Sequence, residues 1–393
     1  MHLILNWILK SKSLLMNWVR KEGHFTESFK RLIKITFPLT FIIFFIVSKA
    51  CYSQVQDSTE KNFRFYPLPI LSYSPETRGT FGAVGLATFR FKNEPLSSRN
   101  SQFEIGAAYT QEEQLFVYMP FDLFIKNEDW WIRGLTGYYD FRYFFYGIGN
   151  QATEDQEELY DLDFFRFRID ALRLVRKHWY LGTRYWLEDY KVVDVEEAGL
   201  LGTNDIIGSE EGLVSTAGII SLWDTRDNYN YPSSGHFLEA LMLLNAHELG
   251  SDFRFSRISL DYAFYKSIGK NVIASNIFVV GMQGDPPFNE LAFIGGSNKM
   301  RGYYLGRYRD KNLAIFQVEW RRMLFWRIGL TAFAGFGNVA PELYAFALSN
   351  TRSSGGLGFR FQLDDKEKIN FRVDYAIGER GSSGFYVAFR EAF

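Results

Sequence analysis

Apolar and polar side chains alternate residue by residue along most of the chain, from about residue 66 to residue 393. In the stretch 368–378, one set of alternate positions is entirely apolar and the other is mostly polar. The first set is Ile369, Phe371, Val373, Tyr375 and Ile377, and the second is Lys368, Asn370, Arg372, Asp374 and Ala376. A period of two residues is typical of a β-strand with one apolar face. Because the pattern recurs at 165–170, 314–321 and 357–363, we expect an all-β fold.

The apolar face of these strands is unusually aromatic, with 39 Phe and 23 Tyr in the chain, while charged residues still make up 23% of the sequence. The mean hydropathy is slightly negative, which excludes a bundle of transmembrane helices. Strands of about ten residues, with aromatic side chains on one face and charges on the other, are typical of a transmembrane β-barrel. A secreted β-sandwich also alternates and is the alternative. In lipid every backbone polar group must be paired, so the sheet has to close.

Sixteen segments carry this pattern, an even number, as a single-chain bacterial barrel requires. The longest predicted connections are 140–159, 191–212, 284–310 and 338–353, and each follows an odd-numbered strand. With the N-terminus in the periplasm, these long connections lie outside the cell and the short turns lie inside. The predicted strands are 66–74, 80–92, 102–110, 114–126, 128–139, 160–171, 178–190, 213–223, 236–247, 253–266, 271–283, 311–322, 326–337, 354–363, 368–378 and 384–393.

A short apolar run near the start of the sequence predicts export. The basic residues Lys30, Arg31 and Lys34 precede the apolar run at 35–47, and small residues follow it. This order is typical of a secretory signal peptide, and the run is too short to span a bilayer comfortably.

These features divide the chain into three parts. Residues 1–54 are expected to be a signal-peptide region, in which Met16 is an alternative start, and residues 55–65 a short periplasmic segment. Residues 66–393 are expected to form the barrel in the outer membrane. A lipoprotein signal with lipidation at Cys51 is the alternative to an ordinary secretory signal, although Ser48 and Lys49 match a lipobox poorly.

Composition excludes several functions. A single Cys cannot make an intramolecular disulfide or a multi-cysteine metal site, and 44 basic against 45 acidic residues give no basic excess for nucleic acid. His236 follows Ser233 and Ser234, but in a predicted turn, and the sequence has no G-x-S-x-G, phosphate loop or paired-histidine motif. We therefore expect no enzyme activity, no cofactor and no metal; an outer-membrane lipid hydrolase is the enzyme alternative.

The connection between the eleventh and twelfth predicted strands carries a glycine pair and then an apolar–Arg–Gly–aromatic tetrad: Gly295, Gly296, Met300, Arg301, Gly302 and Tyr303. Paired glycines allow a sharp reversal, so this loop can tuck into the lumen. There the guanidinium would lose water and need a fixed acceptor. Glu319 is the best partner, because it is an acid on the lumen-facing side of the twelfth predicted strand. The alternative is an exposed arginine in a glycine-rich turn.

This loop resembles the sixth outer loop of the BamA/TamA-type outer-membrane assembly barrels, the bacterial surface antigen family. The stretches 74–79, 145–150 and 224–235 and the final Phe393 also resemble that family, so the resemblance covers nearly all of the predicted barrel. It implies a barrel of about sixteen strands whose long sixth outer loop folds into the lumen.

The resemblance also implies a second acidic partner for Arg301. In the family this acid lies on strand thirteen within a Phe-x-Asp-x-Gly pattern, but Gly335 occupies its position here. Asp374 on the fifteenth predicted strand is the alternative partner. Other inward charges, including Arg166, Arg168 and Arg372, are expected only to solvate a water-filled lumen.

The resemblance further implies a lateral seam between the first and last strands. Pro67 and Pro69 lie in the first strand, and proline belongs at an edge or bulge because it cannot donate to a ladder; ending a short strand is the alternative role. Phe385, Phe389 and Phe393 are expected on the lipid face of the last strand, where they resemble the signal by which barrels are recognised for insertion.

From this resemblance we expect a protein that assists insertion or translocation of proteins or lipids at the outer membrane. Its implied partners are outer-membrane lipids, other assembly subunits and unfolded barrel clients, with no nucleic acid. Residues 55–65 leave no room for the POTRA domains that typical members carry, so a partner would supply them. The alternative is a passive pore or structural barrel that kept the family fold.

Overall fold

The computed structural model describes residues 63–74, 78–153, 156–203, 205–365 and 368–393. The predicted signal-peptide region and residues 55–62 of the predicted periplasmic segment lie outside the described residues. One compact unit comprises Asn62–Arg90 and Glu94–Phe393, and it contains all the strands. Of the second unit, only Phe91–Asn93 lie within the described residues.

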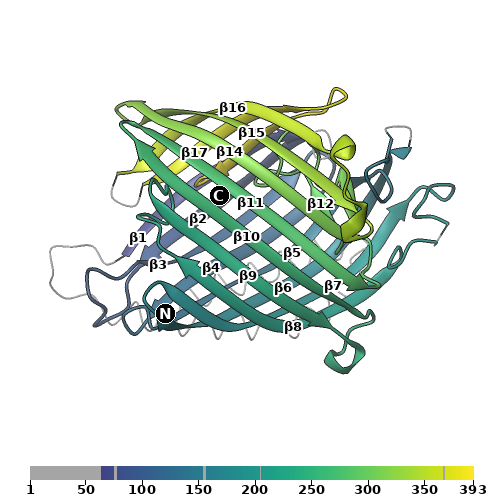
Figure 1. Cartoon of the computed structure of the whole chain (residues 1–393), viewed down its shortest axis with the longest axis horizontal. Helices are drawn as coiled ribbons and strands as arrows, with labels where there is room; N and C mark the ends of the chain where they lie inside the picture. The colour runs from purple at the N-terminus through teal and green to yellow at the C-terminus, as the bar shows by residue number, and fades with distance from the viewer. Residues whose placement is uncertain (1–62, 75–77, 154–155, 204, 366–367) are drawn as a thin grey trace, which may run out of the picture. The chain divides into compact units, whose positions relative to one another are not determined.

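The main unit is an antiparallel β-barrel of sixteen long strands, each paired with the next one in sequence (Figure 1). The predicted fold class is thereby confirmed, and every predicted strand has its counterpart. The strands are β1 (Phe63–Ser74), β2 (Arg78–Phe89), β3 (Ser101–Thr110), β4 (Leu115–Ile125), β5 (Trp130–Phe145), β6 (Glu158–Arg176), β7 (Trp179–Val195), β8 (Glu211–Asp224), β9 (Gly235–Asn245), β10 (Phe255–Ile268), β11 (Asn271–Gly284), β14 (Asn312–Phe325), β15 (Ile328–Ala340), β16 (Arg352–Asp364), β17 (Ile369–Gly378) and β18 (Ser383–Phe389).

The two faces of the sheet are inverted relative to a soluble protein. Arg321, Arg360 and Arg372 are each only 1% exposed, whereas Ile219 and Leu357 are 64% and 70% exposed. Charges buried inside and apolar side chains presented outside fit a barrel that has lipid around it. The period-two alternation of the sequence therefore corresponds to a lumen face and a lipid face.

The barrel has one end with long connections and one with short turns. We call the end that carries 146–157, 196–210, 285–311 and 341–351 the outer end, and the opposite one the periplasmic end. The connections at the outer end include the 3-10 turns η2 (His247–Leu249), η3 (Leu343–Ala345) and η4 (Leu348–Asn350). None of the helices in the described ranges is long and apolar enough to cross a bilayer.

The connection 285–311 contains two short strands that the sequence pattern did not predict. β12 (Ala292–Ile294) pairs with β13 (Tyr308–Asp310) in a separate two-stranded sheet. A three-residue strand is too short to show an alternating pattern, so the prediction treated the whole connection as a loop. The hairpin gives this loop a fixed base.

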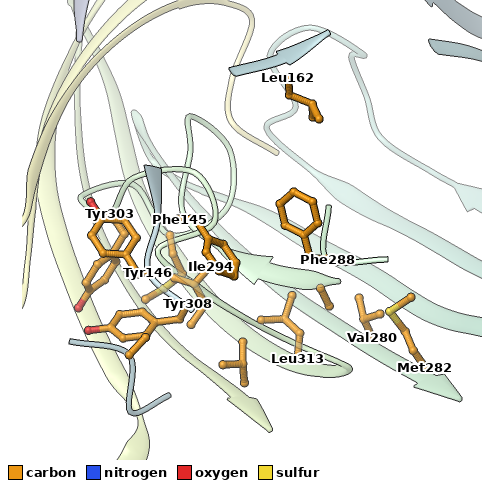
Figure 2. Close-up of a cluster of buried hydrophobic side chains, with 14 of the residues drawn as sticks. Phe145, Tyr146, Leu162, Val280, Met282, Phe288, Ile294, Tyr303, Tyr308 and Leu313 are labelled. Carbon is orange, nitrogen blue, oxygen red and sulfur yellow. The ribbon is translucent and has the colours of Figure 1, made fainter. Parts of the chain in front are cut away.

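The outer end of the lumen is filled by a hydrophobic cluster, which we call the outer cluster (Figure 2). It joins strands β5–β8, β10, β11, β14 and β15 to the long connections. The rings of Phe145 and Phe288 lie 5.5 Å apart, and those of Tyr303 and Tyr308 lie 5.8 Å apart. Its buried residues are Phe145, Tyr146, Ala152, Tyr160, Leu162, Phe164, Tyr190, Leu201, Val214, Phe255, Val280, Met282, Phe288, Ala292, Ile294, Met300, Tyr303, Tyr308, Leu313, Ile315 and Val339.

The turn between β8 and β9, residues 225–234, contacts the inner wall at the periplasmic end. The Tyr229 hydroxyl donates to Asp122 Oδ2 of β4 at 3.0 Å, and its ring meets that of Trp131 of β5 edge-on at 6.2 Å. Asp227 accepts hydrogen bonds from the backbone of Ser233 and Ser234, which fixes the turn. The turn is therefore part of the lumen filling.

Candidate functional site

The loop between β11 and β14 reverses at the predicted glycines. Gly295 has φ +117°, and a Cβ there would lie 1.8 Å from the Tyr304 carbonyl oxygen. The Gly296 backbone N–H donates to the Tyr303 carbonyl at 3.2 Å, and the Gly306 N–H donates to the Ile294 carbonyl at 3.1 Å. These contacts fold residues 295–306 into a compact tip beyond the β12–β13 hairpin.

Arg301 lies at the tip of this loop and is 1% exposed. Its Nη1 donates to Asp374 Oδ2 of β17 at 2.5 Å, and its Nη2 donates to Glu319 Oε1 of β14. The guanidinium lies 3.6 Å from the centre of the Phe333 ring of β15. The structure thus brings together Arg301 and both acids named from the sequence. The two terminal nitrogens of this buried guanidinium hydrogen-bond to carboxylates and an aromatic ring covers its face, whereas its Nε is buried without a hydrogen-bond partner.

Gly335 of β15 lies against the loop. A Cβ at Gly335 would lie 2.8 Å from Met300 Sδ, so a larger side chain at this position would require the Met300 side chain to move. Met300 itself has φ +59° and is fully buried.

Three further arginines complete a network around Arg301 that we call the clasp: Arg301, Glu319, Arg321, Arg360, Arg372 and Asp374. Arg321 Nε donates to Glu319 Oε2 at 2.7 Å, and Arg360 Nη1 donates to Asp374 Oδ1 at 2.5 Å. Arg372 donates to Asp374 at 3.1 Å and to Asn298 Oδ1 of the loop at 2.7 Å. Arg372 therefore binds the loop, and our expectation that it only solvates the lumen is wrong.

Gly302 and Tyr303 dock on the last strands. The Gly302 N–H donates to the Tyr386 hydroxyl of β18 at 2.9 Å, and that hydroxyl donates to the Tyr303 carbonyl at 3.1 Å. The Tyr303 hydroxyl donates to the Ser353 carbonyl of β16 at 2.7 Å and accepts from the Glu379 backbone N–H at 3.0 Å. Tyr386 was not predicted from the sequence, because the role of its hydroxyl depends on the loop lying inside the lumen.

Tyr386→Phe removes a hydroxyl that serves two backbone groups of the loop tip. We expect it to weaken docking by about 1–2 kcal/mol, since a buried donor and acceptor lose their partner. The change is measured as faster proteolysis within residues 295–306 of the folded barrel. Tyr375→Phe on the lipid face of β17 is the control, and an equal effect of both substitutions contradicts the contact.

Glu290, just before β12, makes the loop sensitive to pH. The pKa of Glu290 is raised from 4.5 to about 7: burial is the largest cause, the nearby Glu188 carboxylate acts in the same direction, and Arg166 and Arg257 act in the opposite direction. Because the docked loop holds this proton more tightly than a free loop, docking is strongest below about pH 4.5. It weakens as the pH rises to about 7.

Between pH 4.5 and pH 7, the free energy of loop docking is expected to weaken by about 2–3 kcal/mol. Hydrogen exchange of residues 285–310, corrected for the intrinsic rate, should be roughly tenfold or more faster at pH 8 than at pH 5. Glu290→Gln should abolish the difference. An unchanged pH dependence in that variant assigns the effect to another group.

The seam residues named from the sequence lie at the two ends of the strand order. β1 and β18 are neighbours in space, with Cα atoms within 8 Å, but among the described residues no backbone ladder joins them. Pro67 and Pro69 stay in unbroken register with β2. Because alternate residues of a strand direct their backbone groups to opposite sides, this register requires that the two prolines, which have no N–H, face away from β2 and toward β18. Side chains span the seam instead: the Tyr66 hydroxyl donates to Asp364 Oδ2 at 2.9 Å.

The last strand is shorter than predicted. Phe385 and Phe389 pair with Tyr375 and Phe371 on the lipid face, but β18 ends at Phe389. Phe393 was expected on that face, and this is wrong: its carbonyl accepts from Arg321 at 3.0 Å and its ring packs beside that inward guanidinium. The cause is Arg390, whose φ of +64° turns the chain out of the sheet. At the other edge, β1 begins at Phe63 instead of residue 66.

The His236 ring lies among aromatic side chains. Its Nδ1 is 2.9 Å from the Tyr262 hydroxyl, and its ring stacks on that of Trp223 at 5.3 Å. Ser233 instead donates to Asp227. His236 is therefore part of a group of aromatic side chains, and Ser233 hydrogen-bonds within the turn 225–234.

An inverted barrel with a long loop held inside by a buried arginine defines an outer-membrane β-barrel with a lumenal loop. Residues 97–387 match the Omp85 superfamily domain, which is more than half of the sequence, and the chain belongs to the Omp85 superfamily. This is a family of outer-membrane protein insertion and translocation, whose barrels are outer-membrane proteins. No curated protein sequence matches the chain.

Solved structures share the fold at low identity. BamA from Haemophilus ducreyi lacking POTRA domains 1–3 is 13% identical with a TM-score of 0.53, over 84% of this chain and 69% of that one. CdiB from Acinetobacter baumannii is 12% identical with a TM-score of 0.52, over 84% and 60%. CdiB from Escherichia coli is 10% identical with a TM-score of 0.53, over 85% and 63%. This chain therefore spans less than two thirds of the CdiB chains it matches.

Proposed function

We propose that the protein assists the insertion or translocation of proteins or lipids at the outer membrane through the seam between β1 and β18. The observation that carries this proposal is that the two strands meet without a backbone ladder among the described residues. Unpaired backbone groups in lipid are costly, so such an edge favours pairing with another strand. A client strand that adds to this edge by β-augmentation would gain main-chain hydrogen bonds.

The prolines of β1 fit this role. Pro67 and Pro69 remove two donors from the edge that faces β18, so a full ladder there would be incomplete even if the strands came closer. The side-chain contacts that span the seam, such as Tyr66 with Asp364, can break without unfolding a sheet. This supports a seam that is closed at rest and opens at a modest cost.

The partners remain those expected from the family: outer-membrane lipids, unfolded barrel clients and other assembly subunits. We propose that a partner with periplasmic domains delivers the clients. Export through a signal peptide in residues 1–54 belongs to the same proposal. Co-purification of the tagged protein from mildly solubilised outer membranes tests the partnership, and recovery of the barrel alone contradicts it.

A passive pore is disfavoured by the filled lumen. The outer cluster occupies one end, and the turn 225–234 contacts the wall at the other. In planar bilayers we expect single-channel conductance at least about tenfold below that of an open sixteen-stranded porin. A steady porin-like conductance would favour the pore instead.

The seam itself is tested by tethering it. In a Cys51→Ser background, cysteines are placed at outward positions of β1 and β18, namely Pro67 or Pro69 with Phe385 or Val387, and the pairs that oxidise are kept. In proteoliposomes, the refolding of a urea-unfolded eight-stranded barrel is followed by its gel mobility without boiling. We expect the reduced protein to speed up the refolding of this client. The oxidised protein should not speed it up, and reduction should restore the effect. Equal acceleration by both forms would overturn the role of the seam.

A further inference from the structure

Residues 390–393, which we call the strap, leave β18 and turn into the lumen. The Arg390 backbone N–H donates to the Asn370 carbonyl of β17 at 2.8 Å, and Ala392 is 8% exposed. The Phe393 ring packs among inward residues of β10 and β11, including Tyr265 and Ala274. The strap therefore lies against the inner wall, beside the periplasmic half of the seam.

Glu391 ties the strap to the clasp. Its side chain is 1% exposed, and it accepts from Arg360 Nε at 2.8 Å and from Asn370 Nδ2 at 2.8 Å. Arg321 Nε lies 3.9 Å from it. Arg321 also binds Glu319, and Arg360 also binds Asp374. These two arginines therefore connect Glu391 of the strap to the two acids that bind Arg301 of the loop tip.

Arg390 ties the strap to the opposite side of the seam. Its Nη2 donates to Glu104 Oε1 at 2.6 Å, and Glu104 faces inward on β3. The contact reaches from the end of β18 past β1 and β2, which are the strands next to the seam. The Arg390 guanidinium also lies 5.5 Å from the centre of the Tyr229 ring in the turn 225–234.

We infer that Arg390 and Glu391 are positioning residues that hold the seam shut from inside. Arg390 fixes the end of β18 to β3, and Glu391 fixes it to the clasp, so β18 cannot move away from β1 until these contacts break. Since Glu391 shares its arginines with the partners of Arg301, release of the loop tip also loosens the strap. This inference rests on the proposed function, in which the seam opens.

The test measures the distance between β1 and β18 in the absence of a client protein. Spin labels at Phe65→Cys of β1 and Val387→Cys of β18, in a Cys51→Ser background, report the width of the seam by pulsed EPR in proteoliposomes. Arg390→Glu and Glu104→Arg, made singly, should each raise the wide population about threefold to tenfold, as expected for a lost, partly exposed ion pair. The double charge swap should return it to the starting value, which loss of structure alone would not do.

Arg380→Glu is the matched control, because Arg380 is exposed in the turn before β18 and should leave the width unchanged. Arg390→Gln serves if the reversals do not fold. Glu391→Gln and Arg301→Ala, alone and together, test the coupling: a non-additive change supports the shared network, and strict additivity overturns it. An unchanged width in folded Arg390 variants overturns the strap. A widened seam with unchanged client refolding keeps the strap and rejects the proposed function.

Discussion

Arg301→Ala should release the loop tip and destabilise the barrel by about 3–5 kcal/mol, which is the effect of removing one partner from a buried ion network. The substitution leaves Glu319 and Asp374 buried, with one cation fewer between them. The barrel should therefore lose its folded gel mobility at a lower temperature. Protease added to intact cells should cut within residues 286–310, because this loop is protected only while it is docked in the lumen.

Two variants define what the arginine does. Arg301→Lys keeps the charge but cannot hold two carboxylates with a planar fork, so we expect it to recover only part of the loss. Arg322→Ala removes an exposed arginine of β14 and should change little. Unchanged cleavage around the loop in Arg301→Ala would contradict a docked tip.

Gly302→Ala should have the second largest effect, about 2–4 kcal/mol, because it meets both a backbone and a packing limit. Gly302 has φ +108°, and a Cβ there would lie 2.7 Å from the carbonyl carbon of Ile377. The loop tip would have to move off β17, which would also pull Arg301 from the clasp. Loop proteolysis and the unfolding temperature measure the change.

Gly381 provides the matched control for this substitution. It also has a positive φ, +80°, but a Cβ there meets nothing within 4 Å. Gly381→Ala should therefore cost only the backbone term, about 1 kcal/mol. If both alanine variants behave alike, the close approach of Gly302 to β17 is not what holds the tip.

The strands were predictable because lipid and lumen impose opposite requirements on alternate residues. In β17 the inward set Asn370, Arg372, Asp374 is buried and the outward set holds Tyr375 and Ile377, as the alternation indicates. The ends of strands were harder. The charge of Glu391 interrupts the aromatic pattern of the last strand, and that interruption was the available signal that the chain leaves the sheet.

The clasp was only partly predictable. Glu319 was predicted because it faces the lumen, and Asp374 was the alternative suggested by the resemblance, since Gly335 stands where the family carries an acid. The contact between Gly335 and Met300 appears only when the loop is docked. The contacts of Tyr386 and Arg372 with the loop join residues 74–84 positions apart. No local pattern encodes such pairs, since they depend on which strand faces the loop across the lumen.

The positions of the loop's partners set the order in which the barrel can assemble. Arg301 precedes Asp374 by 73 residues and Gly302 precedes Tyr386 by 84. The strands that hold these two residues, β14–β18, follow the loop in sequence, whereas Lys299 of the tip contacts β10 and β11, which precede it. Contacts this distant form late, after the loop-closure entropy has been met by strand pairing. A barrel halted before β17 would therefore carry a loop tip in which Arg301 lacks Asp374 and Gly302 lacks Tyr386. The buried arginine thus becomes satisfied only when the final strands are in place.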